Sequence, residues 1–169
     1  MTTRVDLGLP SSIWTANDSR ILALNTVASI KMRTSKGIDA NGRKFAGYST
    51  RPIYIRIQGA KLKPKGGTPS ASGRSVFYQN GYREYKNKSR RRVPGGAGQS
   101  AEVDLVLSGA LMNNLVVKEA NQNGFSIGLT NHVAHYGYKV NDDREYIGLT
   151  DKDVDILVAA VEYDIRAKL

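Results

Sequence analysis

Cysteine is absent from this sequence, and its absence excludes several classes of protein. Disulfide-bonded scaffolds, zinc sites built on thiolates and enzymes with a cysteine nucleophile all need that side chain. Long apolar runs are absent too, and none approaches the roughly 20 residues that cross a bilayer. The first ten residues lack a basic segment followed by an apolar one, so we expect no signal peptide and no membrane partner.

The length and composition favour a single soluble domain made in the cytoplasm. A chain of 169 residues buries one hydrophobic core and hardly two, so we expect one domain over residues 1–169. Apolar residues make up 40% of the chain, which argues against wholesale disorder.

Acidic residues are scarce in the middle of the chain, although the whole chain has 15 of them against 25 basic residues. Residues 31–100 contain 17 basic and 2 acidic residues, whereas residues 101–169 contain 6 basic and 11 acidic ones. A chain with this polarity can bind copies of itself head to tail, and such contacts close into rings when the rotation between copies allows. Alternatively, the two halves lie side by side and neutralise each other within one fold.

Apolar residues spaced by three and four predict a helix near each end of the chain. The first covers residues 17–32, with Asn17 or Asp18 accepting the free N–H groups at its start. The second begins at Thr150, and Asp153 three residues later is close to the capping-box pattern. The apolar faces expected to be buried are Ile21, Leu24, Val27 and Ala28 in the first helix, and Val154, Leu157, Val158, Val161 and Ile165 in the second.

Shorter elements are predicted between these helices, after an irregular first ten residues. Alternating apolar residues predict strands over 53–57 and 103–107, and Asn121-Gln122-Asn123-Gly124 predicts a hairpin between residues 115–120 and 125–130. Residues 36–49 are predicted to form a turn-rich loop anchored by Phe45 and Tyr48, Ser108 to cap a short helix, and residues 131–137 to form a short element. The order helix, strands, helix predicts an α+β fold, with the N-terminal and C-terminal helices packed on a small antiparallel sheet.

The composition of residues 60–100 predicts a long, basic, Gly-rich insertion within this domain that is partly flexible. This stretch has ten basic residues and one acidic residue, with seven glycines and three prolines. A structureless loop of this length is unusual inside a compact domain. We therefore expect two flexible basic flanks around one small docked element, with a short helix over residues 81–88. The apolar residues available to dock it are Val76, Phe77, Tyr78, Tyr82 and Tyr85.

No pattern in the sequence predicts catalysis. The only histidines, His132 and His135, are expected to be one packed side chain and one surface side chain rather than metal ligands. Asp142, Asp143 and Glu145 stand together in what is predicted to be a solvated polar loop. Phosphate-binding glycine loops and nucleophile motifs are missing as well. We therefore expect no enzyme activity, no catalytic residue, no metal and no cofactor.

The basic flanks are the candidate binding residues. Phosphate contact needs Lys or Arg on a surface or a flexible arm. Tyr78, Tyr82 and Tyr85 could stack on single-stranded bases, but packing of these tyrosines within their own segment is the favoured interpretation. The residues proposed to meet DNA or an acidic neighbouring protein are Lys61, Lys63, Lys65, Lys88, Arg90, Arg91 and Arg92.

Three groups of short motifs carry a resemblance to a known family. In chain order they are GIDANGRKF at 37–45 with Tyr48 and Ser49; GYREYK at 81–86 with VDL at 103–105 and SGALM at 108–112; and HVAHYG at 132–137 with REYIGLT at 144–150. Together they resemble the tailed-phage virion-morphogenesis or tail-completion family, small proteins of the head–tail connector, or neck. One departure is that Asn141-Asp142-Asp143 precedes Arg144, where the family usually has a proline-like approach.

The resemblance implies a structural virion protein, located at the neck or tail end after synthesis in the host bacterial cytoplasm. Its implied partners are further copies of itself in a ring (a hexamer or dodecamer), a neck or connector protein, a tail terminator or tail tube protein, and genomic DNA in the channel. It also implies that the turn before Phe45 joins helix to sheet, and that the Ser108 helix start and residues 144–150 lock the sheet against the last helix. The alternative is a non-specific nucleic-acid-binding protein.

Overall fold

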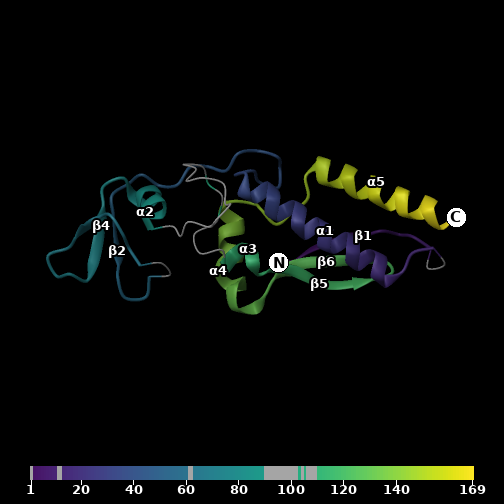
Figure 1. Cartoon of the computed structure of the whole chain (residues 1–169), viewed down its shortest axis with the longest axis horizontal. Coiled ribbons are helices and arrows are strands. Elements are labelled where there is room, and N and C mark those ends of the chain that lie inside the picture. The colour runs from purple at the N-terminus through teal and green to yellow at the C-terminus, as the bar shows by residue number, and fades with distance from the viewer. Residues whose placement is uncertain (1, 11–12, 61–62, 90–102, 104, 106–109) are drawn as a thin grey trace.

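The computed structural model describes the chain except for residues 1, 11–12, 61–62, 90–102, 104 and 106–109. The described residues form a mixed α+β fold, with helices near both ends of the chain and small antiparallel sheets between them (Figure 1). This confirms the predicted fold class. The elements in chain order are β1 (Thr3–Asp6), α1 (Ala16–Ser35), β2 (Ile53–Arg56), β3 (Thr68–Pro69), β4 (Ser75–Tyr78), α2 (Gly81–Ser89), α3 (Ala110–Asn113), β5 (Leu115–Asn121), β6 (Gly124–Leu129), α4 (Asn131–Asp143) and α5 (Asp151–Lys168).

The larger sheet has the strand order β1-β6-β5, and both pairings are antiparallel. The hairpin β5–β6 forms at the predicted position, and Asn121 Oδ1 accepts the Asn123 backbone N–H in its turn at 2.9 Å. The expectation of irregular structure over the first ten residues is wrong, because β1 pairs with β6 along Thr3–Asp6. Four residues are too few for a periodic signal, and the partner strand that stabilises them lies more than 100 residues away.

Helix α1 packs against this sheet, and α5 lies on the side of α1 away from the sheet (Figure 1). The predicted cap of α1 is wrong by two or three residues, because the Thr15 side chain accepts from the Asp18 backbone in a capping box. The predicted buried face is also largely wrong, since Ile21 and Leu24 are half exposed. Apolar residues surround most of this helix, so periodicity alone does not select the face that meets the sheet. The buried residues of α1 are Ser19, Leu22, Ala23, Thr26, Val27, Ile30, Arg33 and Thr34.

The capping box of α5 is confirmed, and its predicted apolar stripe is confirmed only in part. Thr150 Oγ1 accepts the Asp153 N–H at 3.1 Å, and Asp153 Oδ2 accepts the Thr150 N–H at 2.9 Å. Leu157 is buried, whereas Val154 and Val158 are 44% and 51% exposed. Among the described elements, α5 packs mainly on α1, and this contact covers a narrower face of α5 than its apolar residues occupy.

Arg33 of α1 joins three parts of the chain. Its guanidinium forms a buried ion pair with Asp153 of α5 and donates to the Tyr146 and Gly148 carbonyls at 2.9 and 3.0 Å. Buried Asn141 of α4 accepts the Tyr146 and Ile147 N–H groups at 3.0 and 2.8 Å. Residues 144–150 therefore hold the last helix against α1 and α4. They also contact the sheet, because the Thr3 hydroxyl of β1 donates to the Ile147 carbonyl at 3.4 Å.

The turn before Phe45 meets the same segment. Asp39 Oδ1 accepts the Asn41 and Arg43 N–H groups, which closes the turn. The Ala40 N–H donates to the Glu145 carbonyl at 2.7 Å, and the Asn41 side chain donates to the Glu145 carboxylate at 3.0 Å. Phe45 packs against the main hydrophobic cluster, as its predicted anchoring role requires.

A second, smaller unit, here called the small lobe, comprises β2, β3, β4 and α2. Its sheet has the strand order β2-β4-β3, and α2 packs on it around Val76, Tyr78 and Tyr85. Helix α2 begins at Gly81, whose φ is +65° and whose Cβ position lies 2.4 Å from the Arg51 carbonyl oxygen, so only glycine fits there. The predicted strand at 53–57 and helix at 81–88 are thus confirmed within one residue.

Two further expectations, for residues 103–107 and 131–143, are corrected. The element predicted at 131–137 continues to Asp143, so Asp142 and Asp143 end helix α4 rather than standing in a loop. Of the strand predicted at 103–107, the structure describes only Val103 and Leu105, and neither lies in a strand. Ser108 lies outside the described residues. The Arg-rich flank of the predicted insertion, residues 90–92, also lies outside them, and its flexibility stays a prediction.

Replacing Arg33 is expected to destabilise the protein strongly. Arg33→Met leaves the Asp153 carboxylate and two carbonyls buried without their donor, which typically costs about 3–5 kcal/mol in the free energy of unfolding. Urea unfolding measures this loss for Arg33→Met, for Asp153→Asn, which retains an oxygen for the cap, and for the double variant. The double variant should lose clearly less than the sum of the single losses. Additive losses would contradict a direct Arg33–Asp153 coupling.

The ends of α1 and α5 are joined by a second ion pair, which makes stability depend on pH. Lys168 Nζ lies 2.5 Å from Asp18 Oδ2, and this ammonium, together with the Thr15 donors, lowers the pKa of Asp18 from 3.8 to about 2. Because the folded pKa is depressed, the pair's contribution is complete above about pH 5 and is lost as the pH falls through 2. NMR titration should place the Asp18 midpoint near 2, and Lys168→Met should raise it. A midpoint near 3.8 in the unmodified protein would refute this coupling.

Candidate functional site

The structure brings three of the predicted basic residues together on the small lobe. Lys63 and Lys65 are exposed, and the segment that carries them runs beside the end of α2. The Lys65 backbone N–H donates to Ser89 Oγ at 3.1 Å, and Lys88 Nζ donates to the Gly66 carbonyl at 2.7 Å. The remaining predicted residues, Lys61, Arg90, Arg91 and Arg92, lie outside the described residues.

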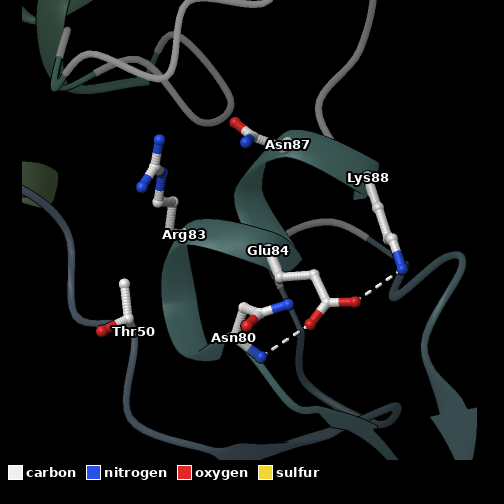
Figure 2. A pocket seen from close by; sticks show the side chains of 6 residues that line it. All are labelled: Thr50, Asn80, Arg83, Glu84, Asn87 and Lys88. Atoms are coloured by element: carbon white, nitrogen blue, oxygen red, sulfur yellow. Dashed lines mark hydrogen bonds and ion pairs between the residues drawn. The ribbon is translucent and has the colours of Figure 1, made fainter.

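A polar hollow of about 370 Å³ lies along α2, between Thr50 and Lys88 (Figure 2). Its one carboxylate, Glu84, accepts the Asn80 N–H at 2.8 Å and lies 2.6 Å from Lys88 Nζ. The Lys88 ammonium lowers the pKa of Glu84, so this group is ionised at neutral pH and already paired. A general acid needs a raised pKa and a free proton, so Glu84 is a structural partner of α2.

The tyrosines of the small lobe pack within their own segment, as the favoured interpretation predicts. Tyr78 is fully buried, and Tyr85 lies against it with ring centroids 5.5 Å apart. Tyr82 contacts Tyr48 at 5.3 Å, and burial raises the pKa of the Tyr82 hydroxyl. These rings stabilise the lobe. Tyr78 and Tyr85 are buried and not available for stacking on bases, and Tyr82 is partly covered.

Other cations of the small lobe are exposed and unpaired. Four arginines project from it without an ion-pair partner among the described residues. They are distributed over the chain, so no local charge run marks them as a group in the sequence. They are Arg51, Arg56, Arg74 and Arg83.

Acidic side chains gather on α5 instead. Asp151 and Asp155 are exposed and have no ion-pair partner in the described part of the chain, and Glu162 has only a long contact of 3.9 Å with Arg166. Helix α5 extends away from the small lobe, towards the opposite end of the long axis (Figure 1). The basic and acidic surfaces of these elements therefore do not neutralise each other side by side.

Sequence reasoning missed two exposed surfaces. One is the aromatic pair of Tyr54 and Phe77 on the small sheet, with ring centroids 4.9 Å apart and Tyr54 61% exposed. The other is the row Ile21, Leu24 and Met32 on α1, which is 50–57% exposed. The alternation over residues 53–57 predicts that Tyr54 lies on the opposite side of the strand from the apolar residues. The row on α1 has the same spacing as the buried face of a helix, so the sequence does not mark it as exposed.

The described residues hold no cluster suited to metal binding. No group of three or more His, Asp or Glu side chains converges within them. Both His132 and His135 are exposed, so the expectation that one of them is packed is wrong. Among these residues, no helix is long and apolar enough to cross a membrane.

Comparisons with protein-family models, curated proteins and solved structures found no match to this chain.

Proposed function

We propose that this chain is a structural virion protein of the tailed-phage head–tail connector or tail-completion ring, joining the tail to the neck through contacts between subunits. The proposal assigns no chemistry to any residue. The chain then acts by presenting surfaces to its own copies, to a neck or connector protein and to a tail terminator or tail tube protein. In this role it is located in the virion, with genomic DNA passing through the channel.

The observation that carries the proposal is the exposed apolar surface of the two helices α1 and α5. Ile21, Leu24 and Met32 recur on α1 at steps of three and eight, on the side of the helix away from its buried residues. On the neighbouring helix, Ile156 and Tyr163 are 51% and 75% exposed. Exposed apolar surface of this extent is typical of a site that another protein covers.

The motifs that carry the family resemblance support the same proposal, because they meet as structural joins. The 37–45 turn binds the 144–150 segment through Ala40 and Glu145. The 81–86 motif starts α2, and Tyr48 beside it lies 5.4 Å from the Arg144 guanidinium. These contacts hold elements together, which is what a subunit with no chemical role requires.

The size of the protein in solution tests this proposal. We expect a ring-sized species, alone or after addition of purified neck or tail tube protein, by sedimentation or native mass spectrometry. A chain that stays monomeric under both conditions would contradict the proposal.

Substitution of Leu24 tests the apolar face itself. Leu24→Glu places a charge on exposed α1 surface, so folding should be unaffected while association weakens about tenfold or more. Gln122→Glu, at the exposed β5–β6 turn, introduces the same charge away from this face and is the matched control. Equal assembly by the two variants would show that the apolar face does not join subunits.

The alternative function, non-specific binding of nucleic acid, is favoured by the unpaired arginines of the small lobe and by Lys63 and Lys65. Simultaneous replacement of Arg90, Arg91 and Arg92 by alanine separates the two functions. If the basic flank acts in the neck, head–tail joining and infectivity should fall while DNA affinity in solution is low. If the chain is a DNA-binding protein, its affinity should depend steeply on salt, and the variant should reduce that slope by about one for each phosphate that it no longer neutralises. Intact infectivity and joining would remove the role assigned to the flank.

A further inference from the structure

We infer that the open face of the small sheet binds the acidic face of α5 from a second copy of the chain. This inference rests on the proposed function and names the contact that would link one subunit to the next.

The small sheet has one covered and one open face. Ile53 and Ile55 pack towards the cluster beneath α2, so alternation along β2 directs Tyr54 and Arg56 to the other side. Tyr54 pairs directly with Phe77 of β4, and its 61% exposure shows that the described residues leave it largely uncovered. The open face thus presents two aromatic rings beside a guanidinium.

This composition is typical of a protein contact. Aromatic residues and arginine are enriched at interfaces, because they supply large contact areas and directional hydrogen bonds. A sheet with an apolar face is usually covered by a helix. Helix α2 already covers one face, so a helix on the other face would complete a three-layer arrangement.

Helix α5 carries a face of matching chemistry, here called the acidic row. Its residues recur at steps of three and four and so share one side of the helix. Two valines, 44% and 51% exposed, lie between carboxylates along this side. The acidic row consists of Asp151, Val154, Asp155, Val158 and Glu162.

The two faces complement each other in charge and in apolar character. Arg56 has no ion-pair partner among the described residues, and neither has Asp155. A guanidinium and a carboxylate can form paired hydrogen bonds, while the valines offer the aromatic rings an apolar surface. The further exposed cations of the small lobe extend the attraction over a longer range.

A single chain cannot make this contact with itself, because the small sheet and α5 lie towards opposite ends of the long axis (Figure 1). A second copy can place its acidic row on the open sheet face of the first, and the remaining face of each copy stays free for a further neighbour. The contact is heterologous, so repetition leads to a closed ring when the rotation between subunits allows it. One helix on a short three-stranded sheet covers less than the roughly 800 Å² per partner of a stable interface. Association through this contact should therefore weaken with added salt and gain from ring closure.

Charge exchange between the two faces tests the inference. Arg56→Glu and Asp155→Lys should each weaken self-association about tenfold or more, measured by sedimentation of the full chain alone and with neck protein. In an equimolar mixture, a ring in which the two variants alternate joins opposite charges at every contact. The mixture should therefore assemble to within about threefold of the unmodified protein. Matched controls are Lys139→Glu, at an exposed position of α4, and Asp143→Lys, at the end of the same helix. Both controls should assemble normally.

The possible outcomes distinguish this inference from the proposed function. If rings form but neither exchange weakens them, or if the mixture is no better than the single variants, this contact is wrong and the ring function stands. If no second copy binds, either alone or with neck protein, the inference and the proposed function both fail. If Tyr54→Ser and Arg56→Glu abolish binding of single-stranded DNA but leave assembly unchanged, the open face binds nucleic acid and the inference is overturned.

Discussion

The buried guanidinium of Arg33 is the contact on which the arrangement of this fold depends. It pairs with Asp153 at the start of α5 and donates to the carbonyls of Tyr146 and Gly148, so one side chain of α1 fixes both the last helix and the segment before it. Asp153 also caps α5 by accepting from Thr150. Removing either charge leaves the other buried and unpaired, which is strongly unfavourable. The position of α5, and with it the acidic row, follows from this network.

Local signals predict much of the fold, and the failures have a common physical cause. The α5 capping box, the β5–β6 hairpin and helix α2 each depend on residues a few positions apart, and all three are confirmed. Strand β1, the buried face of α1 and the structural role of Arg33 depend on partners far away in the sequence. Arg33 has the features of a residue that interacts with the helix dipole, and only the tertiary fold makes it a buried link to Asp153.

The candidate surfaces also divide into features that the sequence shows and features that only the tertiary structure shows. The bipolar charge is visible in the composition, and the structure adds that the small sheet and α5 lie far apart (Figure 1). Base stacking by Tyr78 and Tyr85 is excluded by their burial, whereas the exposed pair of Tyr54 and Phe77 emerges only from the strand register. A chain that leaves apolar rows and opposite charges unpaired on separate elements has surfaces suited to a neighbour. This physical logic connects the fold to the ring that we propose.

Image reconstruction of the assembled particle tests this account most directly. The account predicts a ring of this chain between head and tail, with the small lobe of each copy seated on α5 of the next. A density map in which the chain is absent from the neck and tail end, or is present there as isolated copies that do not touch, would contradict it.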